Sequence, residues 1–105
     1  MAQDNTLYMV VPCYNEEAVL RETAKRLKEK YISLRERELI SAESRVVFVN
    51  DGSKDKTWQI ISELHEEEPD LFSGIELARN SGHQNAVLAG LMTVKDICGM
   101  AITMD

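Results

Sequence analysis

The stretch VVFVNDGSKDKT, residues 46–57, changes from an apolar to a polar pattern in its middle. It opens with Val and Phe residues that suit a buried strand, and the strand runs directly into Asn50, Asp51 and Gly52. A turn at this point needs Gly or Asn, but it does not need an acid at the tip of the strand. The position of Asp51 therefore raises the question of whether its carboxylate serves the fold or a ligand.

Apolar runs predict four strands in the chain as a whole. They lie at residues 7–11, which Pro12 closes, and at 45–49, 74–77 and 100–104. Helical patterns fill the three intervals between them, which gives the order β-α-β-α-β-α-β. This order is typical of parallel sheets with right-handed crossovers. The fold class that we expect is α/β, with a Rossmann-like, mostly parallel sheet and helices on both faces.

Each predicted helix has an apolar face and recognisable end residues. The first helix begins near Asn15, a candidate N-cap that two glutamates follow. Ser53 or Asp55 can cap the second helix, Pro69 ends it, and the third helix runs from Gly82. The residues predicted to face the core are Leu20, Ala24, Leu27, Tyr31 and Leu34 in the first helix, Trp58, Ile61 and Leu64 in the second, and Ala86, Ala89, Met92 or Thr93, and Ile97 in the third.

The segments that follow the strands are polar and rich in possible ligand-binding residues. They are PCYNEE, NDGSKDKT and ARNSGHQN after the first three strands, and Asp105 at the end of the fourth. Ordinary connections such as EEEPDLFS and KDICG lead to the opposite edge. Since parallel sheets bind ligands at the carboxyl ends of their strands, we expect one composite site at that edge.

The residue types at this edge indicate a nucleotide diphosphate together with a metal ion. No G-x-G-x-x-G or P-loop motif follows the first strand, so a glycine-rich phosphate cradle is not expected there. Carboxylates suit base N–H groups, ribose hydroxyls and divalent cations, whereas a guanidinium binds diphosphate oxygens bidentately. The carboxylates are Glu16, Asp51 and Asp105, and the donors are Arg79, Asn80, His83 and Gln84.

Four motifs together resemble glycosyltransferase family 2, which has the GT-A fold. They are VVPCYNEE, VFVNDGSKDKT, RNSGHQNAVLAGL and a strand that ends in TMD. The third motif is most similar to the polyprenyl-phosphate branch, which includes dolichol-phosphate mannose synthases and undecaprenyl-phosphate sugar transferases. The resemblance covers essentially the whole chain. It implies that residues 1–105 are the N-terminal, nucleotide-sugar-binding half of the domain, truncated at Asp105.

The resemblance also implies a role for each matched residue. Pro12, Tyr14 and Glu16 would line the nucleoside pocket, with Tyr14 against the base and Glu16 near the base or the ribose. Asp51 would accept a hydrogen bond from the base, which favours uracil or guanine over adenine. The remaining nucleotide-sugar-binding residues would be Gly52 and Ser53, which form the turn, and Arg79, Asn80, His83 and Gln84, which lie beside the diphosphate and sugar.

Asp105 resembles the first acid of the family's Asp-x-Asp metal motif, so it would bind both the nucleotide sugar and a Mg²⁺ or Mn²⁺ ion. Its partner acid would come two residues later, beyond the end of the chain. No catalytic residue is implied within residues 1–105. We therefore expect an N-terminal fragment that binds a nucleotide at best weakly and does not transfer sugar by itself.

The implied reaction of the full-length protein moves a sugar from a UDP- or GDP-sugar to an acceptor, with inversion at the anomeric carbon. The acceptor would be a polyprenyl phosphate or a glycan, in cell-envelope glycan synthesis. A polyprenyl phosphate is already an anion, so its attack needs no strong general base. The implied location is the cytoplasm, at the inner face of the plasma membrane, with membrane association only in the full-length protein.

Other interpretations of single residues and of the whole chain stay open. Asp51 can brace its own turn, Tyr14 can belong to the core, and His83 can be a helix-start residue. A non-catalytic nucleotide-sugar-binding domain, a nucleotidyltransferase and a receiver-like signalling module share this architecture. A receiver normally places paired acids after its first strand, whereas the acids here are spread over several strands.

The bulk composition excludes several other classes. The 105 residues form one small domain or part of one, and the formal net charge of −6 argues against nucleic acid as a partner. Basic residues of the first helix alternate with Glu22 and Glu29, which favours a solvated face over a membrane surface. Cys13 and Cys98 lack a paired spacing, so we expect reduced thiols rather than a disulfide.

Overall fold

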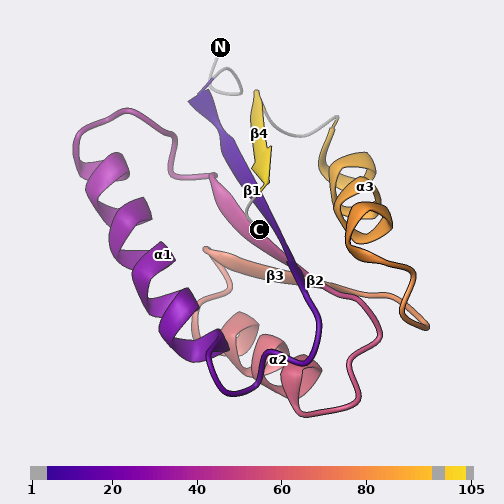
Figure 1. The fold of residues 1–105 in the computed structure, drawn as a ribbon. Coiled ribbons are helices and arrows are strands. Elements are labelled where there is room, and N and C mark those ends of the chain that lie inside the picture. The colour runs from indigo at the N-terminus through magenta and orange to yellow at the C-terminus, as the bar shows by residue number, and fades with distance from the viewer. Residues whose placement is uncertain (1–4, 96–98, 104–105) are drawn as a thin grey trace.

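The structure, a computed structural model, describes residues 5–95 and 99–103 and contains a four-stranded parallel sheet in the order β3-β2-β1-β4. The strands are β1 (Leu7–Cys13), β2 (Arg45–Asn50), β3 (Phe72–Glu76) and β4 (Met100–Thr103). The helices are α1 (Leu20–Glu36), α2 (Thr57–Glu67) and α3 (His83–Val94) (Figure 1). The α/β class and the parallel, Rossmann-like sheet expected from the sequence are confirmed.

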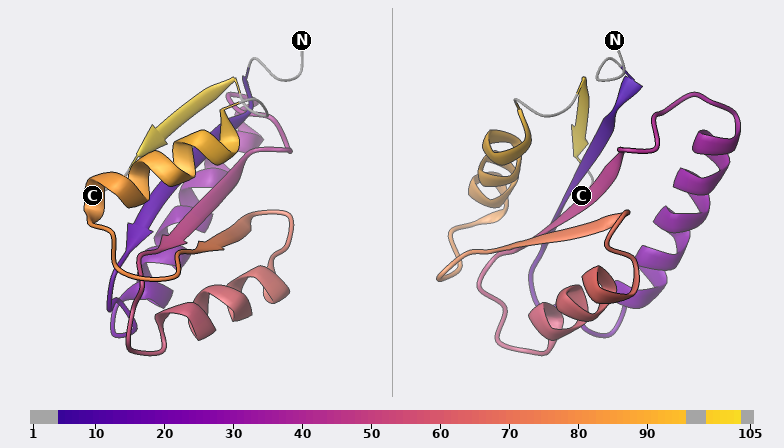
Figure 2. Two further views of the ribbon diagram at one scale, coloured as in Figure 1. Left: turned by 90° about the vertical axis from the view of Figure 1, so that its right-hand side faces the viewer. Right: turned by 180° about the vertical axis from the view of Figure 1, so that it is seen from behind.

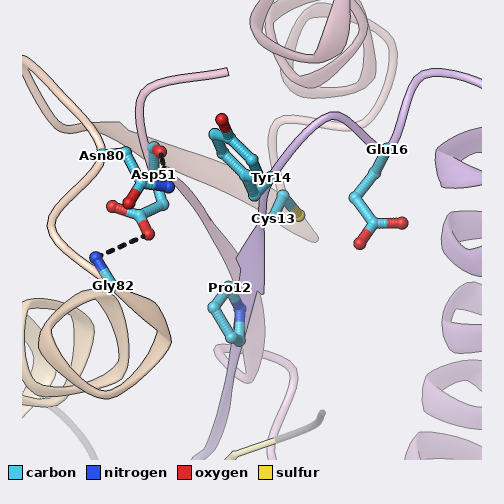
Figure 3. Close-up of a pocket in the computed structure, with 7 residues that line it drawn as sticks. All are labelled: Pro12, Cys13, Tyr14, Glu16, Asp51, Asn80 and Gly82. Atoms are coloured by element: carbon cyan, nitrogen blue, oxygen red, sulfur yellow. Dashed lines mark hydrogen bonds between the residues drawn. The ribbon is translucent and has the colours of Figure 1, made fainter.

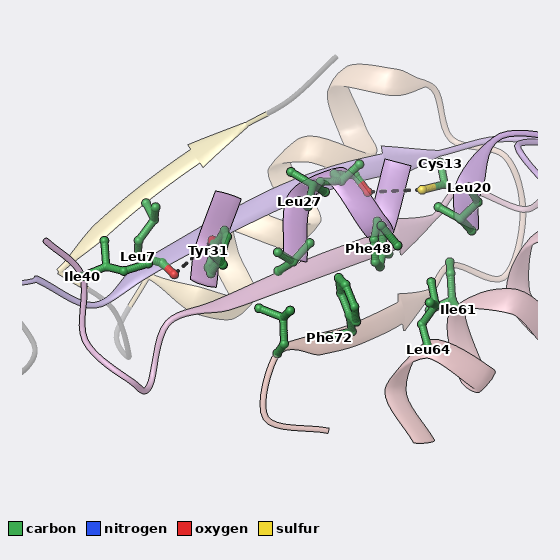
Figure 4. Close-up of a cluster of buried hydrophobic side chains, with 14 residues drawn as sticks. Leu7, Cys13, Leu20, Leu27, Tyr31, Ile40, Phe48, Ile61, Leu64 and Phe72 are labelled. Carbon is green, nitrogen blue, oxygen red and sulfur yellow. Dashed lines mark hydrogen bonds between the residues drawn. The ribbon is translucent and has the colours of Figure 1, made fainter. Parts of the chain in front are cut away.

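Helices cover both faces of the sheet, with α1 and α2 on one face and α3 on the other (Figure 2). The alternation of side chains along β2 explains this arrangement, since Val46 and Phe48 join one apolar cluster while Val47 and Val49 join the other. The larger cluster lies under α1 and α2 (Figure 4). The α1 residues buried in it are Leu20, Ala24, Leu27 and Tyr31. The predicted apolar face of the first helix is therefore confirmed.

The predicted end of the first strand and the predicted start of the first helix were wrong. Pro12 does not end β1, because the strand continues to Cys13. Pro12 pairs in register with Val49 of β2. The Cys13 carbonyl accepts a hydrogen bond on the β2 side, so strand alternation directs the backbone of Pro12 away from β2. The first helix begins at Leu20 rather than near Asn15. A turn precedes it, in which the carbonyl of Glu16 accepts hydrogen bonds from the N–H groups of residues 19 and 20.

The inward face of α3 also differs from the prediction. Ala86, Gly90 and Val94 are buried at steps of four, whereas Met92 and Thr93 are exposed. A Cβ at Gly90 would lie 2.4 Å from Cγ1 of Val10, so glycine lets the helix lie directly on the sheet. The prediction failed because glycine has no apolar side chain, so Gly90 was not counted as a core-facing position. Ile97 lies outside the described residues.

A second glycine fits α2 onto the edge strand β3. A Cβ at Gly74 would lie 2.5 Å from Cγ2 of Ile61 and 3.2 Å from the ring of Trp58, which is half-buried. The strand begins at Phe72, before the predicted start at residue 74, because the buried ring of Phe72 packs against Phe48 with 5.6 Å between ring centroids. In the described ranges, no helix has both the length and the apolarity needed to cross a membrane.

Candidate functional site

Three loops meet at the carboxyl ends of the strands. They follow β1, β2 and β3, and they form a pocket of about 300 Å³ (Figure 3). Its lining residues are Pro12, Cys13, Tyr14, Glu16, Asp51, Asn80 and Gly82. Residues that are distant in the sequence, and that were assigned to one composite site from the sequence, thus share one pocket.

Hydrogen bonds fix the β1 loop to the β2 loop. The Asn15 N–H donates to Oγ of Ser53 at 2.9 Å, and Oδ1 of Asn15 accepts from the Lys54 N–H at 2.9 Å. The Glu16 N–H donates to Oγ1 of Thr57 at 2.8 Å. Asn15 has a left-handed backbone with φ of 52°, which asparagine tolerates better than most residues. The sequence had suggested that Asn15 caps α1, but Val19 is at the N-cap. Asn15 instead connects the β1 loop to the β2 loop.

Asp55 adds further hydrogen bonds at the same junction between the β1 and β2 loops. Its carboxylate accepts hydrogen bonds from the Glu17 N–H at 3.2 Å and from the Thr57 N–H at 2.9 Å, and also from the Thr57 hydroxyl. Desolvation raises the pKa of the Asp55 carboxyl, but the hydrogen bonds from Thr57 and Glu17 outweigh it and hold the pKa below its ordinary value. Lys56 is the N-cap of α2, so the prediction that Ser53 or Asp55 caps this helix was wrong. Asp55 precedes the helix and joins its first N–H group to the β1 loop.

Asp51 connects the β2 loop to the β3 loop. Its side chain is 3% exposed, and its Oδ1 accepts hydrogen bonds from the N–H and the hydroxyl of Ser81 at 2.8 and 3.1 Å. Its Oδ2 accepts from the Gly82 N–H at 3.2 Å (Figure 3). The Asn80 side chain also donates to the main-chain carbonyl of Asp51 at 3.3 Å. From the sequence, Asp51 was expected either to brace its own turn or to bind a base. Neither expectation included this contact between the β2 and β3 loops.

Gly52 is required where these two loops touch. Its φ is +71°, and a Cβ there would lie 2.3 Å from the backbone nitrogen of Asn80 and 2.5 Å from the carbonyl carbon of Arg79. A side chain at this position would therefore strain the backbone and push the β3 loop away. The turn role predicted for Gly52 agrees with this geometry. Ser53, the other predicted turn residue, bonds to the β1 loop.

The side chains at the rim and floor of the pocket have different environments. Tyr14 is 43% exposed, so the interpretation that placed it in the core was wrong. Cys13 is buried, and burial, with a smaller effect of the Glu16 charge, raises the pKa of its thiol to about 12. The thiol is therefore neutral at physiological pH, as expected of a small buried apolar residue. Cys98 lies outside the described residues.

The other predicted site residues lie around the pocket or outside the description. Arg79 and Gln84 are exposed and do not line the pocket, although Arg79 belongs to the β3 loop and Gln84 to the first turn of α3. His83 is the first residue of α3, and nothing is described of its side chain. Asp105 lies outside the described residues.

A metal site at the pocket would depend on how the described acidic side chains are grouped. Over residues 5–95 and 99–103, no group of three or more His, Cys, Asp or Glu residues is placed to hold a metal ion. Both carboxylate oxygens of Asp51 already accept hydrogen bonds, which leaves Glu16 as the other acid lining the pocket. Among the described residues, no complete ligand set for a divalent cation is therefore grouped at the pocket.

Sequence reasoning missed the roles of Ser81 and Gly82. The signal was present, because a Ser-Gly pair directly before a helix offers backbone N–H groups that no helical carbonyl satisfies. It also missed Cys13 as a lining residue, since an apolar residue at a strand end gives no sign of a ligand.

A parallel sheet whose carboxyl-end loops surround a pocket has the architecture of α/β domains that bind ligands at this edge. The family model described as glycosyl transferase family 2 matches residues 8–99 of the chain. The chain belongs to this family. The family that the motifs predicted is thereby confirmed.

Named relatives support the same assignment. An uncharacterized glycosyltransferase of Bacillus subtilis (strain 168) is 43% identical over 99 residues, which cover 94% of this chain and 29% of the relative. A prophage bactoprenol glucosyl transferase homolog of Escherichia coli (strain K12) is 40% identical over 83 residues, covering 79% of this chain and 25% of the relative. A dolichyl-phosphate beta-glucosyltransferase of Trichomonas vaginalis is 37% identical over 91 residues, covering 85% and 27%. The chain thus spans between 25% and 29% of the length of these relatives.

Proposed function

We propose that this chain binds the nucleotide sugar in an inverting glycosyltransferase, which transfers a sugar from a UDP- or GDP-sugar to a polyprenyl phosphate in cell-envelope glycan synthesis. The observation that carries the proposal is the pocket at the carboxyl ends of the strands, because the loops that enclose it contain the family's motifs. The names of the bactoprenol and dolichyl-phosphate relatives support the acceptor class.

The pocket suits the nucleoside part of such a donor. Its volume of about 300 Å³ is at the lower end of the range for small-ligand sites, roughly 300–1,000 Å³. The half-exposed ring of Tyr14 offers an aromatic face for a base, and the carboxylate of Glu16 offers acceptors for base N–H groups or ribose hydroxyls. The diphosphate would extend from the pocket toward Arg79 on the β3 loop.

The chemistry of the acceptor fits the residues that line the pocket. A polyprenyl phosphate attacks as an anion, so it does not require a strong base to remove a proton. Asp51, whose carboxylate is committed to Ser81 and Gly82, is not free to act as one. A Mg²⁺ or Mn²⁺ ion, when bound, would neutralise charge on the leaving diphosphate, and we propose Asp105 as its ligand in this chain.

Calorimetry with UDP and with GDP, each in the presence of Mn²⁺, tests the proposal. We expect measurable heat from one of the two nucleotides and a weaker signal from ADP, because adenine lacks the ring N–H that uracil and guanine donate. Glu16→Gln should weaken binding of the preferred nucleotide, whereas Glu66→Gln, in the exposed part of α2, is the matched control. Absence of heat from both UDP and GDP would refute nucleotide binding.

We further propose that the 105-residue chain binds the nucleotide without transferring sugar. The support is that relatives named as transferases are more than three times as long, since the chain covers 29% of the first and 25% of the second. Measurable transfer by the chain to an undecaprenyl phosphate would contradict this. We also propose that the full-length protein acts in the cytoplasm at the inner face of the plasma membrane, where fractionation would locate it.

A further inference from the structure

We infer that Asp51 is a positioning residue, which fixes the β3 loop that carries Arg79 and Asn80 and so links the base end of the site to its diphosphate end. The inference rests on the proposed function for the identity of the ligand. The contact between the loops is independent of that function, because residues of the chain alone make it.

The hydrogen bonds of Asp51 leave little of its carboxylate for another partner. An ionised carboxylate has about four acceptor positions on its two oxygens. Three of them are taken, two on Oδ1 by Ser81 and one on Oδ2 by Gly82. One position on Oδ2 is left for a base N–H. Asp51 can therefore contact a base only while it also holds the β3 loop.

The backbone conformation of the β3 loop at Gly82 allows this contact with Asp51. Gly82 has φ of +96°, yet a Cβ there would meet nothing within 4 Å, so glycine is needed for the backbone conformation and not for space. That conformation presents the Gly82 N–H to Oδ2 of Asp51 just before α3 begins. A carboxylate at this position is also favoured by the positive end of the helix dipole.

Two consequences follow for a bound diphosphate. The Ser81 and Gly82 N–H groups, which would otherwise suit a phosphate at a helix N-terminus, are already used by a protein carboxylate. Any contact from the β3 loop to the diphosphate must then come from its side chains, such as those of Arg79 and Asn80. The position of these side chains depends on Asp51 through the loop backbone, which lies against Gly52.

Amide hydrogen exchange in the protein without nucleotide tests the contact directly. Asp51→Asn keeps the size of the side chain but replaces one acceptor oxygen with an NH2 donor, which then faces the N–H group of either Ser81 or Gly82 and loosens the loop that contains both. We expect exchange of these two N–H groups to accelerate by about tenfold or more, with exchange in β1 unchanged. Asp55→Asn is the matched control, and it should release the Glu17 N–H while leaving those of Ser81 and Gly82 protected. Unchanged exchange at Ser81 and Gly82 in Asp51→Asn would overturn the inference.

A ligand series separates positioning from base contact. The ratio of the UMP and UDP dissociation constants, or of the GMP and GDP constants, measures the contribution of the second phosphate. If Asp51 contacted only the base, Asp51→Asn would weaken both ligands equally and leave the ratio unchanged, which would contradict positioning. We expect the ratio to fall by about threefold to tenfold, the size of one or two weakened hydrogen bonds.

Two further arms keep the result interpretable. If Asp51→Asn does not fold, Ser81→Ala removes only the hydroxyl bond and should give a smaller change in the same direction, and no change would count against the inference. If the unmodified protein binds neither nucleotide, the proposed function fails, whereas the exchange experiment still decides whether Asp51 holds the β3 loop.

Discussion

At the scale of single residues, the site depends on glycines whose backbones no other residue can replace at low cost. Gly52 and Gly82 both have positive φ, at +71° and +96°, but their surroundings differ. Gly52 is pressed against the backbone of the β3 loop, whereas space around Gly82 is open. The two positions therefore separate the cost of backbone strain from the cost of a steric clash.

Gly52→Ala should destabilise the protein more than Gly82→Ala. A positive φ costs a residue with a Cβ about 1–3 kcal/mol at either position. At Gly52 the clash with Asn80 adds about 1–3 kcal/mol, because backbone must move to relieve it. The free energy of unfolding from urea titrations measures both variants. Equal losses at the two positions would show that the β3 loop moves aside without cost.

At the scale of elements, the loops are joined in sequence order, β1 loop to β2 loop and β2 loop to β3 loop. Asp55 and Thr57 hold the first junction, and Asp51 holds the second. The loops that follow β1, β2 and β3 are thus connected to one another as well as to the sheet. They form one hydrogen-bonded layer over the carboxyl ends of the strands.

The Asp55 junction should make stability depend on pH in the acid range. The pKa of Asp55 is lower in the folded protein than its ordinary value of 3.8, so its contribution is present above that value and is lost as the pH falls through the folded pKa. The stability difference between the unmodified protein and Asp55→Asn should be larger at about pH 7 than at about pH 3. Urea titrations at the two pH values measure it, with Asp70→Asn as a control. A difference that does not shrink in acid would assign the effect to something other than the ionised carboxylate.

At the scale of the whole molecule, a second layer of contacts closes the edge opposite the site. The guanidinium of Arg35, near the end of α1, donates to the carbonyl of Ser44 before β2 at 2.5 Å and to that of Asp70 before β3 at 3.3 Å. It also lies 6.0 Å from the centre of the Tyr31 ring. One side chain thus ties a helix to the starts of two neighbouring strands.

Arg35→Met should lower stability without changing nucleotide affinity. The substitution removes hydrogen bonds to a charged donor, worth about 1–3 kcal/mol in total at a partly exposed position, while keeping most of the apolar stem. Thermal unfolding measures the loss, and calorimetry with the preferred nucleotide measures the affinity. Arg37→Met, at an exposed position beyond α1, is the matched control. A loss of affinity in Arg35→Met would mean that the two edges of the sheet are coupled.

The sequence predicted the parts of the fold that depend on local periodicity. The buried face of α1 and the buried β2 strand were predicted because their apolar spacing is regular. The inward position of Gly90 was not, since it depends on how closely α3 approaches Val10. The pairing of Asp51 with Ser81 was also beyond reach, because the residues are 30 positions apart and only the folded sheet brings their loops together. The list of residues at the pocket was therefore easier to predict than their mutual contacts.

The register of the sheet has a consequence for how the chain folds as it is synthesised. Leu7 of β1 pairs with Met100 of β4. One edge of the central strand β1 therefore stays unpaired until β4, more than 80 residues later in the sequence, has been synthesised. The β1-β2-β3 part and its two helices can assemble earlier, since β1 meets β2 after a much shorter interval. Until β4 leaves the ribosome, β1 presents an unpaired strand edge of the kind that promotes aggregation. Slow synthesis of the last residues of this region would thus favour misfolding before the site is complete.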